Sequence, residues 1–214
     1  EVIACHWAAV YYDSGARIVD DLQEILSCND LSLDQFDAIL DFGCGCGRLL
    51  RHVHPRTGAD LHGTDLNDRL VAWSQKHLPF ARFAANDLHP PLSYEDQSFD
   101  FIYARSVFTH LPEALQQEWI RELRRLLRPG GYLYLTTHGR PMSGGLTDEQ
   151  QARLEAGELI ETYSSVAGTN LCSTYATRPW VEERLLEDFE LVDFVEGRDD
   201  SHLRQDIYVA KRIR

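Results

Sequence analysis

Three glycines alternate with other residues directly after a short apolar run, in the stretch Ala38–Leu50, AILDFGCGCGRLL. Residues 38–43 predict a buried strand, and the residues from Arg48 onward predict the start of a helix. Glycine lets a backbone approach a ligand closely and adopt angles that other residues avoid. Because the first turn of a helix has unpaired N–H groups, we expect this loop to receive an anion or a carboxylate. A tight turn with nothing bound is the alternative for the glycines alone.

The spacing of the glycines separates two classes of cofactor. A dinucleotide-binding loop has the pattern GxGxxG. Here the third glycine is Gly47 and the next position holds Arg48, so the pattern is GxGxG, with Asp41 at the end of the preceding strand. An NAD-dependent oxidoreductase is therefore the less favoured alternative.

Apolar periodicity predicts alternating strands and helices through the first two thirds of the chain. After the first strand, further strands are expected at 59–65, 81–85, 99–104 and 131–137. Helices are expected at 17–28, 68–77 and 113–127. This alternation is typical of βαβ units and a parallel sheet.

The last third of the chain departs from this alternation. Residues 139–176 are rich in Gly, Ser and Thr around a polar helix at 147–160, and we interpret them as a covering segment. A helix near 179–188 is followed by two alternating segments, 189–195 and 206–210, which predict a closing antiparallel hairpin.

The length of the chain favours a single domain. Along residues 1–214 we expect four parts: an N-terminal helical cap at 1–37, a cofactor-binding core at 38–138, the covering segment at 139–176, and the C-terminal helix and hairpin at 177–214.

Composition excludes several partners. The chain has 21 Lys and Arg against 34 Asp and Glu, a formal net charge of -13, which disfavours binding to nucleic acid or to an anionic membrane. Its five cysteines have neither disulfide-framework nor paired zinc-site spacing, so reduced thiols and a cytoplasmic location are expected. The start lacks the pattern of a signal peptide. Because residue 1 is Glu rather than Met, we expect a trimmed or processed start.

The motifs in order resemble those of the class I S-adenosylmethionine-dependent methyltransferases, particularly their small-molecule, type 11/12-like members. That family's first motif is (D/E)xGxGxG, which Asp41 to Gly47 match. Asp65 in HGTDL stands where the family binds the ribose hydroxyls, and Asp87 in NDL stands where it binds the adenine amino group. Residues 98–111 and the LRPGG at 127–131 match the family's later landmarks, so the resemblance covers roughly residues 38–138.

The resemblance implies an α/β fold with a Rossmann-like, seven-stranded, mostly parallel sheet in the order 3-2-1-4-5-7-6 and helices on both faces. It implies S-adenosylmethionine as cofactor and S-adenosylhomocysteine as product. The residues it assigns to the cofactor are Asp41, Gly43, Cys44, Gly45, Cys46, Gly47, Arg48, Asp65, Leu66, Asn86, Asp87, Leu88, Arg105 and Ser106.

Methyl transfer from a sulfonium is an in-line displacement that needs alignment more than a covalent nucleophile. A general base helps where the acceptor is protonated, and His110, after the fourth strand, is the candidate. Residues 104–107 read ARSV rather than (D/N)PPY, the motif of the family's nucleic-acid and glutamine methylating members, so a small-molecule acceptor is expected. No metal site is assigned. A non-catalytic cofactor-binding scaffold on the same fold is the alternative.

The acceptor pocket is expected from the N-terminal segment and the covering segment, because these remain to roof the crevice beyond the strand ends. Its candidate residues are His6, Trp7, Tyr11, Tyr12, His138, Arg140, Tyr163 and Asn170. We expect these residues to govern acceptor choice and the glycine loop to govern donor binding.

Overall fold

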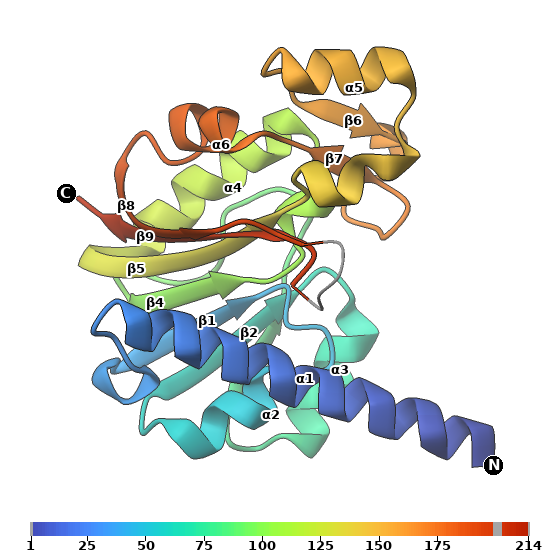
Figure 1. Cartoon of the computed structure of the whole chain (residues 1–214). Coiled ribbons are helices and arrows are strands. Elements are labelled where there is room, and N and C mark those ends of the chain that lie inside the picture. Colours follow the sequence, from blue (N-terminus) through green and yellow to red (C-terminus); the bar gives the residue numbers. More distant parts are fainter. Residues whose placement is uncertain (1, 199–202, 214) are drawn as a thin grey trace. The chain divides into compact units, whose positions relative to one another are not determined.

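The computed structural model describes residues 2–198 and 203–213, with side chains from residue 10 onward (Figure 1). The chain divides into two compact units, Glu1–Ala85 and Asn86–Arg214. The boundary falls inside the stretch expected to form one cofactor-binding core, and the four-part single domain stays a prediction. Within the described residues, the helices are all too short or too polar to cross a membrane.

The first unit alternates helices and parallel strands. Its elements are α1 (Val2–Cys28), η1 (Leu33–Gln35), β1 (Ala38–Phe42), α2 (Leu50–Val53), η2 (His54–Arg56), β2 (Asp60–Asp65), α3 (Asp68–His77) and β3 (Arg82–Ala85). Strand β2 pairs in parallel with β1 on one side and with β3 on the other. All five residues of β1 are buried, as the apolar run predicts. Asn67 caps α3 by accepting from the backbone N–H groups of Arg69 and Leu70.

Helix α1 is much longer than the helix expected at 17–28, because Gly15 does not end it. Gly15 lies inside α1, and a Cβ there would stand 2.7 Å from the carbonyl oxygen of Arg48. The glycine therefore permits close packing of the helix on the segment after β1, rather than marking a turn.

The second unit begins with a parallel pair and ends with the antiparallel hairpin. Its elements are β4 (Phe99–Ala104), η3 (Phe108–His110), α4 (Glu113–Leu126), β5 (Leu127–Thr137), η4 (Arg140–Gly145), α5 (Asp148–Glu155), β6 (Ile160–Thr162), η5 (Ser164–Val166), β7 (Ser173–Tyr175), α6 (Arg178–Arg184), β8 (Phe189–Val195) and β9 (Asp206–Arg212). Strands β4 and β5 are parallel, and β9 is antiparallel to both β5 and β8. The closing hairpin is confirmed.

Some expected boundaries in this unit were wrong, including the helix expected near 179–188, which is α6 at Arg178–Arg184, and one pair of strands was not expected. Strand β5 starts at Leu127 instead of Gly131, because Leu127 pairs with Phe99 and the Pro-Gly-Gly residues fit an irregularity before Tyr132. Helix α5 ends at Glu155, before Gly157 at φ 90, instead of at residue 160. The covering segment contains an unexpected antiparallel pair, β6 and β7.

The main sheet has seven strands in the order β3-β2-β1-β4-β5-β9-β8, while β6 and β7 form a separate sheet of two. When only the strands of the main sheet are numbered, this is the predicted order 3-2-1-4-5-7-6. The α/β class and the mostly parallel sheet are confirmed.

Asp206, at the start of β9, should make stability depend on pH. Its side chain is 4% exposed and accepts a 2.9 Å hydrogen bond from the backbone N–H of Gly197. Burial raises the pKa of Asp206 from 3.8 to about 6. A carboxyl whose pKa is higher in the folded than in the unfolded state destabilises the fold as pH rises between those two values.

We expect Asp206→Asn to increase the free energy of unfolding by about 1–2 kcal/mol at pH ~7, since the variant removes a buried negative charge. Below pH ~4 the variant and the parent should differ little, because the parent carboxyl is then protonated in both states. Urea unfolding of both proteins at the two pH values tests this. If the free energies of unfolding of the variant and the parent differed equally at both pH values, the raised pKa assigned to Asp206 would be contradicted.

Candidate functional site

The glycine loop after β1 has the backbone that its sequence predicts. Gly43, Gly45 and Gly47 have φ of 84, 55 and 68 degrees, in the left-handed region that favours glycine. At Gly47 packing gives a further reason, because a Cβ would stand 2.4 Å from Leu78 Cδ1. At Gly45 a Cβ would meet only Leu70 Cδ1, at 4.0 Å. Among the side chains that the structure describes, none other fills the space beside Gly45.

Asp65 joins the end of β2 to this loop. Its Oδ2 accepts a 2.7 Å hydrogen bond from the backbone N–H of Gly45, and its Oδ1 accepts one of 2.8 Å from Asn67. Asp65 is partly exposed, and the Leu66 side chain beside it is 41% exposed. Each carboxylate oxygen can accept more than one hydrogen bond, so Asp65 keeps capacity for a ligand's hydroxyl groups.

The segment after the loop is not the helix that the sequence predicts. Helix α2 begins at Leu50 instead of Arg48 and has four residues. So short a helix has little macrodipole. The helix start expected at Arg48 is wrong, and the anion or carboxylate site expected at this loop stays a prediction. The open side of the loop offers its own backbone, together with the carboxylate of Asp65.

Two other predicted cofactor residues of this unit are buried. Asp41 is 2% exposed within β1, and Cys44 is 5% exposed. Burial raises the pKa of the Cys44 thiol, and the carboxylates of Asp41 and Asp65 act in the same direction. Cys44 is therefore a protonated packing residue rather than a nucleophile or a metal ligand.

Helix α1 brings Tyr11 to the glycine loop. Tyr11 Oη lies 3.6 Å from Cys46 Sγ, and the Arg48 guanidinium lies over the Tyr11 ring at 5.1 Å. Arg48 also donates a 3.1 Å hydrogen bond to Ser14 Oγ. Burial, followed by the contact with Cys46, raises the pKa of Tyr11 to about 12. These contacts place Tyr11 beside the glycine loop, and its expected role in the acceptor pocket stays a prediction.

The other aromatic candidates of α1 are less informative. The Tyr12 ring packs edge-on against His52, with centroids 4.4 Å apart, and the Tyr12 side chain is 51% exposed. The side chains of His6 and Trp7 lie outside the described residues.

The second unit begins with three predicted cofactor residues, Asn86, Asp87 and Leu88, which precede β4. Asn86 Nδ2 donates to the carbonyl oxygen of Asp87 at 2.8 Å, and Trp119 Nε1 donates to that of Leu88 at 2.9 Å. The Asp87 side chain is exposed. These contacts fix the course of the backbone and leave the Asp87 carboxylate accessible.

A cluster of hydrogen-bonded side chains lies at the carboxyl ends of β4 and β5. Ser106 has a φ of 62 degrees, and its N–H donates to Thr136 Oγ1 at 2.8 Å. Gln205 Nε2 donates to Ser106 Oγ at 2.7 Å, and Thr136 Oγ1 donates to Gln205 Oε1 at 2.8 Å. Arg105 Nη1 lies 3.3 Å from Thr136 Oγ1. A left-handed non-glycine residue held by buried partners is typical of a functional site.

Gln205 and Thr136 were not predicted. Thr136 lies within an apolar strand and Gln205 just before one, and neither position carries a sequence pattern that distinguishes a site residue from an ordinary polar one.

His110 is held in one tautomer by the covering segment. Its Nδ1 lies 2.7 Å from the carbonyl oxygen of Cys172. A carbonyl oxygen only accepts, so Nδ1 carries the proton and Nε2 has a free lone pair when the ring is neutral. The backbone N–H of Gly168 donates to the carbonyl oxygen of His110 at 2.9 Å. His110 is thus oriented as a proton acceptor through Nε2.

His138 lies beside His110 but has different electrostatics. The ring centroids are 6.1 Å apart. Burial, and then the neighbouring His110, lower the pKa of His138 to about 4. His138 is therefore neutral at physiological pH and is a poorer proton acceptor than an unperturbed histidine.

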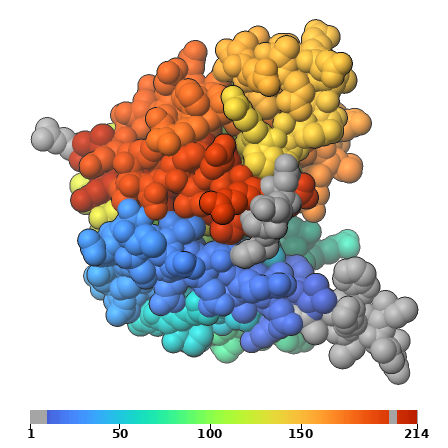
Figure 2. All heavy atoms as spheres, viewed as in Figure 1, coloured from blue at the N-terminus to red at the C-terminus, as the bar shows by residue number. Residues whose placement is uncertain are grey.

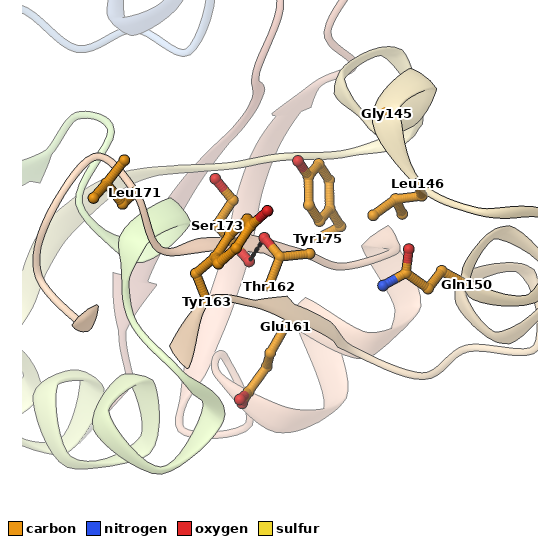
Figure 3. Close-up of a pocket in the computed structure, with 9 residues that line it drawn as sticks. All are labelled: Gly145, Leu146, Gln150, Glu161, Thr162, Tyr163, Leu171, Ser173 and Tyr175. Atoms are coloured by element: carbon orange, nitrogen blue, oxygen red, sulfur yellow. Dashed lines mark hydrogen bonds between the residues drawn. The ribbon is translucent and has the colours of Figure 1, made fainter. Parts of the chain in front are cut away.

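The covering segment encloses a pocket of about 520 Å³ (Figure 3). Its lining comes from η4, α5, β6, β7 and the segment between these two strands: Gly145, Leu146, Gln150, Glu161, Thr162, Tyr163, Leu171, Ser173 and Tyr175. Tyr163 was predicted, whereas Arg140 and Asn170 are exposed and outside this lining. Among residues 2–198 and 203–213, no group of three or more His, Cys, Asp or Glu is placed to hold a metal ion.

Comparison with known proteins agrees with this geometry. Residues 39–131 match a family model described as a methyltransferase domain. The phosphoethanolamine N-methyltransferase of Plasmodium falciparum is 27% identical over 131 residues, which cover 60% of this chain and 47% of that protein. The chain spans about half, or less, of the length of the curated relatives it matches.

Solved structures share the fold. A methyltransferase from Methanosarcina mazei, titled S-adenosylmethionine-dependent, has a TM-score of 0.64 at 22% identity, covering 86% of this chain and 94% of its own. A Burkholderia thailandensis didemethyltoxoflavin methyltransferase with bound S-adenosylhomocysteine has a TM-score of 0.64 at 18% identity, covering 100% and 88%. Residues 39–131 therefore match a methyltransferase domain, and the chain shares its fold with solved S-adenosylmethionine-dependent methyltransferases.

Proposed function

We propose that this chain transfers a methyl group from S-adenosylmethionine to a small-molecule acceptor. The observation that carries the proposal is the hydrogen bond from Gly45 to Asp65, which joins the glycine loop to the acidic end of β2. The named acceptors of similar proteins, phosphoethanolamine and didemethyltoxoflavin, are small molecules and support this acceptor class.

The residues of the first unit fit such a cofactor. Gly45 combines a left-handed backbone with open space, so a ligand can approach where a side chain would intrude. In this proposal Asp65 accepts hydrogen bonds from the ribose hydroxyls while it holds the loop through Gly45, and Tyr11 and Arg48 lie at the same loop. We assign the other predicted cofactor residues, Asn86 to Leu88, Arg105 and Ser106, to the same role as part of the proposal.

When bound, S-adenosylmethionine supplies a methyl group already activated by its sulfonium. The chain then has to exclude water, align the acceptor and, where the acceptor carries a proton, remove it. His110 is the residue for the last task, because the carbonyl oxygen of Cys172 leaves Nε2 as the accepting atom. Neutral His138 lies beside it, with ring centroids 6.1 Å apart.

The expected acceptor class and the expected compartment rest on the net charge and on the state of the cysteines. The net charge of -13 favours a small-molecule acceptor over nucleic acid. Cys28, Cys44, Cys46 and Cys172 are free thiols, which supports a reducing compartment such as the cytoplasm.

Calorimetric titration tests the choice of cofactor. We expect S-adenosylmethionine to bind and NADH to give no heat of binding, because position 48 lacks the glycine of the dinucleotide pattern. Binding of NADH with no response to S-adenosylmethionine would restore the oxidoreductase alternative.

A further inference from the structure

The pocket of the covering segment has almost no charge of its own. Of its lining residues only Glu161 is ionisable near neutral pH, and its carboxylate is already engaged. Glu161 Oε1 accepts a 2.8 Å hydrogen bond from the backbone N–H of Glu113, and Oε2 accepts one of 2.9 Å from Ser164 Oγ. In Figure 3 this side chain points away from Tyr175. With Glu161 at its edge and no cation in its lining, the pocket disfavours an acceptor bearing a phosphate or a carboxylate.

Aromatic and apolar side chains also line this pocket, beside the polar atoms that make up most of its accessible surface. Two tyrosine rings, Tyr163 and Tyr175, and two leucines, Leu146 and Leu171, face it from different elements (Figure 3). Ser173 and Gln150 add hydroxyl and amide groups. Aromatic rings with a few placed polar groups are the usual lining for a small organic ligand.

Tyr163 is held in an unusual way. Its side chain is 76% exposed, and its φ of 55 degrees lies in the left-handed region that non-glycine residues rarely adopt. Leu171, also on the pocket lining, is 70% exposed. Strained backbone and large exposed apolar side chains around one pocket are typical of a surface that a ligand covers.

The pocket adjoins the histidine pair within the second unit. The Tyr175 ring lies 5.3 Å from that of His138, and residue 175 forms an isolated β-bridge with residue 138. His138 in turn lies beside His110. The pocket and the histidine pair are therefore neighbours within the second unit, with the Tyr175 and His138 rings between a ligand in the pocket and His110.

From these observations we propose that the pocket binds the methyl acceptor and that the acceptor carries an uncharged aromatic ring, held between Tyr163 and Tyr175. This deepens the proposed function and rests on it. Tyr163 and Leu171 determine acceptor specificity in this account, and the hydroxyl and amide groups of the lining orient the ring's substituents.

Three phenols that share a ring and differ in charge test the acceptor class: neutral tyrosol, cationic tyramine and anionic hydroxyphenylacetate. Saturation-transfer NMR with the whole protein and S-adenosylhomocysteine measures their binding. We expect tyrosol to bind at least about tenfold more tightly than hydroxyphenylacetate, since the pocket has no cation to offset desolvation of the carboxylate. Tyramine should also bind more weakly than tyrosol, because Glu161 is already engaged.

Variants test the place of binding. Tyr163→Ala should weaken tyrosol binding about fivefold, and Leu171→Ser about threefold, through loss of aromatic and apolar contact. Ile213→Ser, an exposed apolar residue outside the pocket, is the matched control and should change nothing. Both pocket residues are exposed, so the variants should fold.

The results that would overturn the aromatic acceptor site differ from those that would overturn the proposed methyltransferase function. No binding of any phenol, preference for the anion or the cation, or tyrosol binding indifferent to both pocket variants would overturn it. Titration of the same samples with S-adenosylmethionine separates the two proposals: a protein that binds the donor and fails these tests loses only the aromatic acceptor site, and one that does not bind the donor loses the proposed function.

Discussion

Asp65→Ala should weaken S-adenosylmethionine binding by about 1–3 kcal/mol, equivalent to a loss of affinity of roughly fivefold to more than a hundredfold. Two effects add. The ribose hydroxyls lose a charged acceptor, and the backbone N–H of Gly45 loses the 2.7 Å hydrogen bond that sets the loop. Calorimetric titration of the variant and the parent measures the difference.

The matched control is Asp60→Ala, at the opposite end of the same strand. Asp60 pairs with Arg82 at 3.0 Å and with His62 at 3.2 Å, and its side chain is largely exposed. We expect its removal to change donor affinity less than about twofold, because surface pairs contribute little. A folded Asp65→Ala protein with parental affinity would remove Asp65 from the cofactor site.

His110→Ala should lower the rate of methyl transfer about a hundredfold, the usual contribution of a positioned general base. Donor affinity should stay within about threefold, because the variant removes a proton acceptor and not a donor contact. The measurement is the initial rate of labelled methyl transfer to acceptors in a metabolite extract.

His77→Ala provides the control, because His77 is an exposed histidine at the end of α3. Its rate should match the parent's. A His110→Ala enzyme that also keeps the parental rate would show that alignment suffices and that the acceptor needs no base. A variant that loses donor binding as well would place His110 in the cofactor site instead.

The parts predicted well from sequence are those fixed by local pattern. The apolar run of β1 and the alternation along β8 and β9 predict strands because burial selects apolar residues at these positions. The glycine spacing predicts a loop with left-handed backbone, and Gly43, Gly45 and Gly47 all have it.

The errors come from tertiary contacts that local pattern does not encode. The helix expected at 17–28 extends back through Gly15, where the Arg48 carbonyl packs closely against the helix. Arg48 itself was expected in a helix, yet its side chain bonds to Ser14 and stacks on Tyr11. Both errors concern one packing contact between α1 and the segment after β1.

Candidate site residues could be predicted from the sequence where they belong to a motif, and the others could not. Asp65 follows from its place one strand after the glycine loop, and its bond to Gly45 agrees with that role. Gln205 reaches Ser106 from the other end of the second unit, a separation that no spacing rule covers. Tyr175 lines the pocket because β6 and β7 pair, and three-residue strands leave too little pattern to detect.

Transfer of a labelled methyl group tests most directly the claim that this chain methylates a small molecule. The whole protein is incubated with S-adenosylmethionine carrying an isotopically labelled methyl group and a metabolite extract, and the products are separated by mass. The account predicts formation of S-adenosylhomocysteine and appearance of the label in a small molecule. Binding of S-adenosylmethionine with no S-adenosylhomocysteine formed and no label transferred would contradict it and identify a non-catalytic binding protein on the same fold.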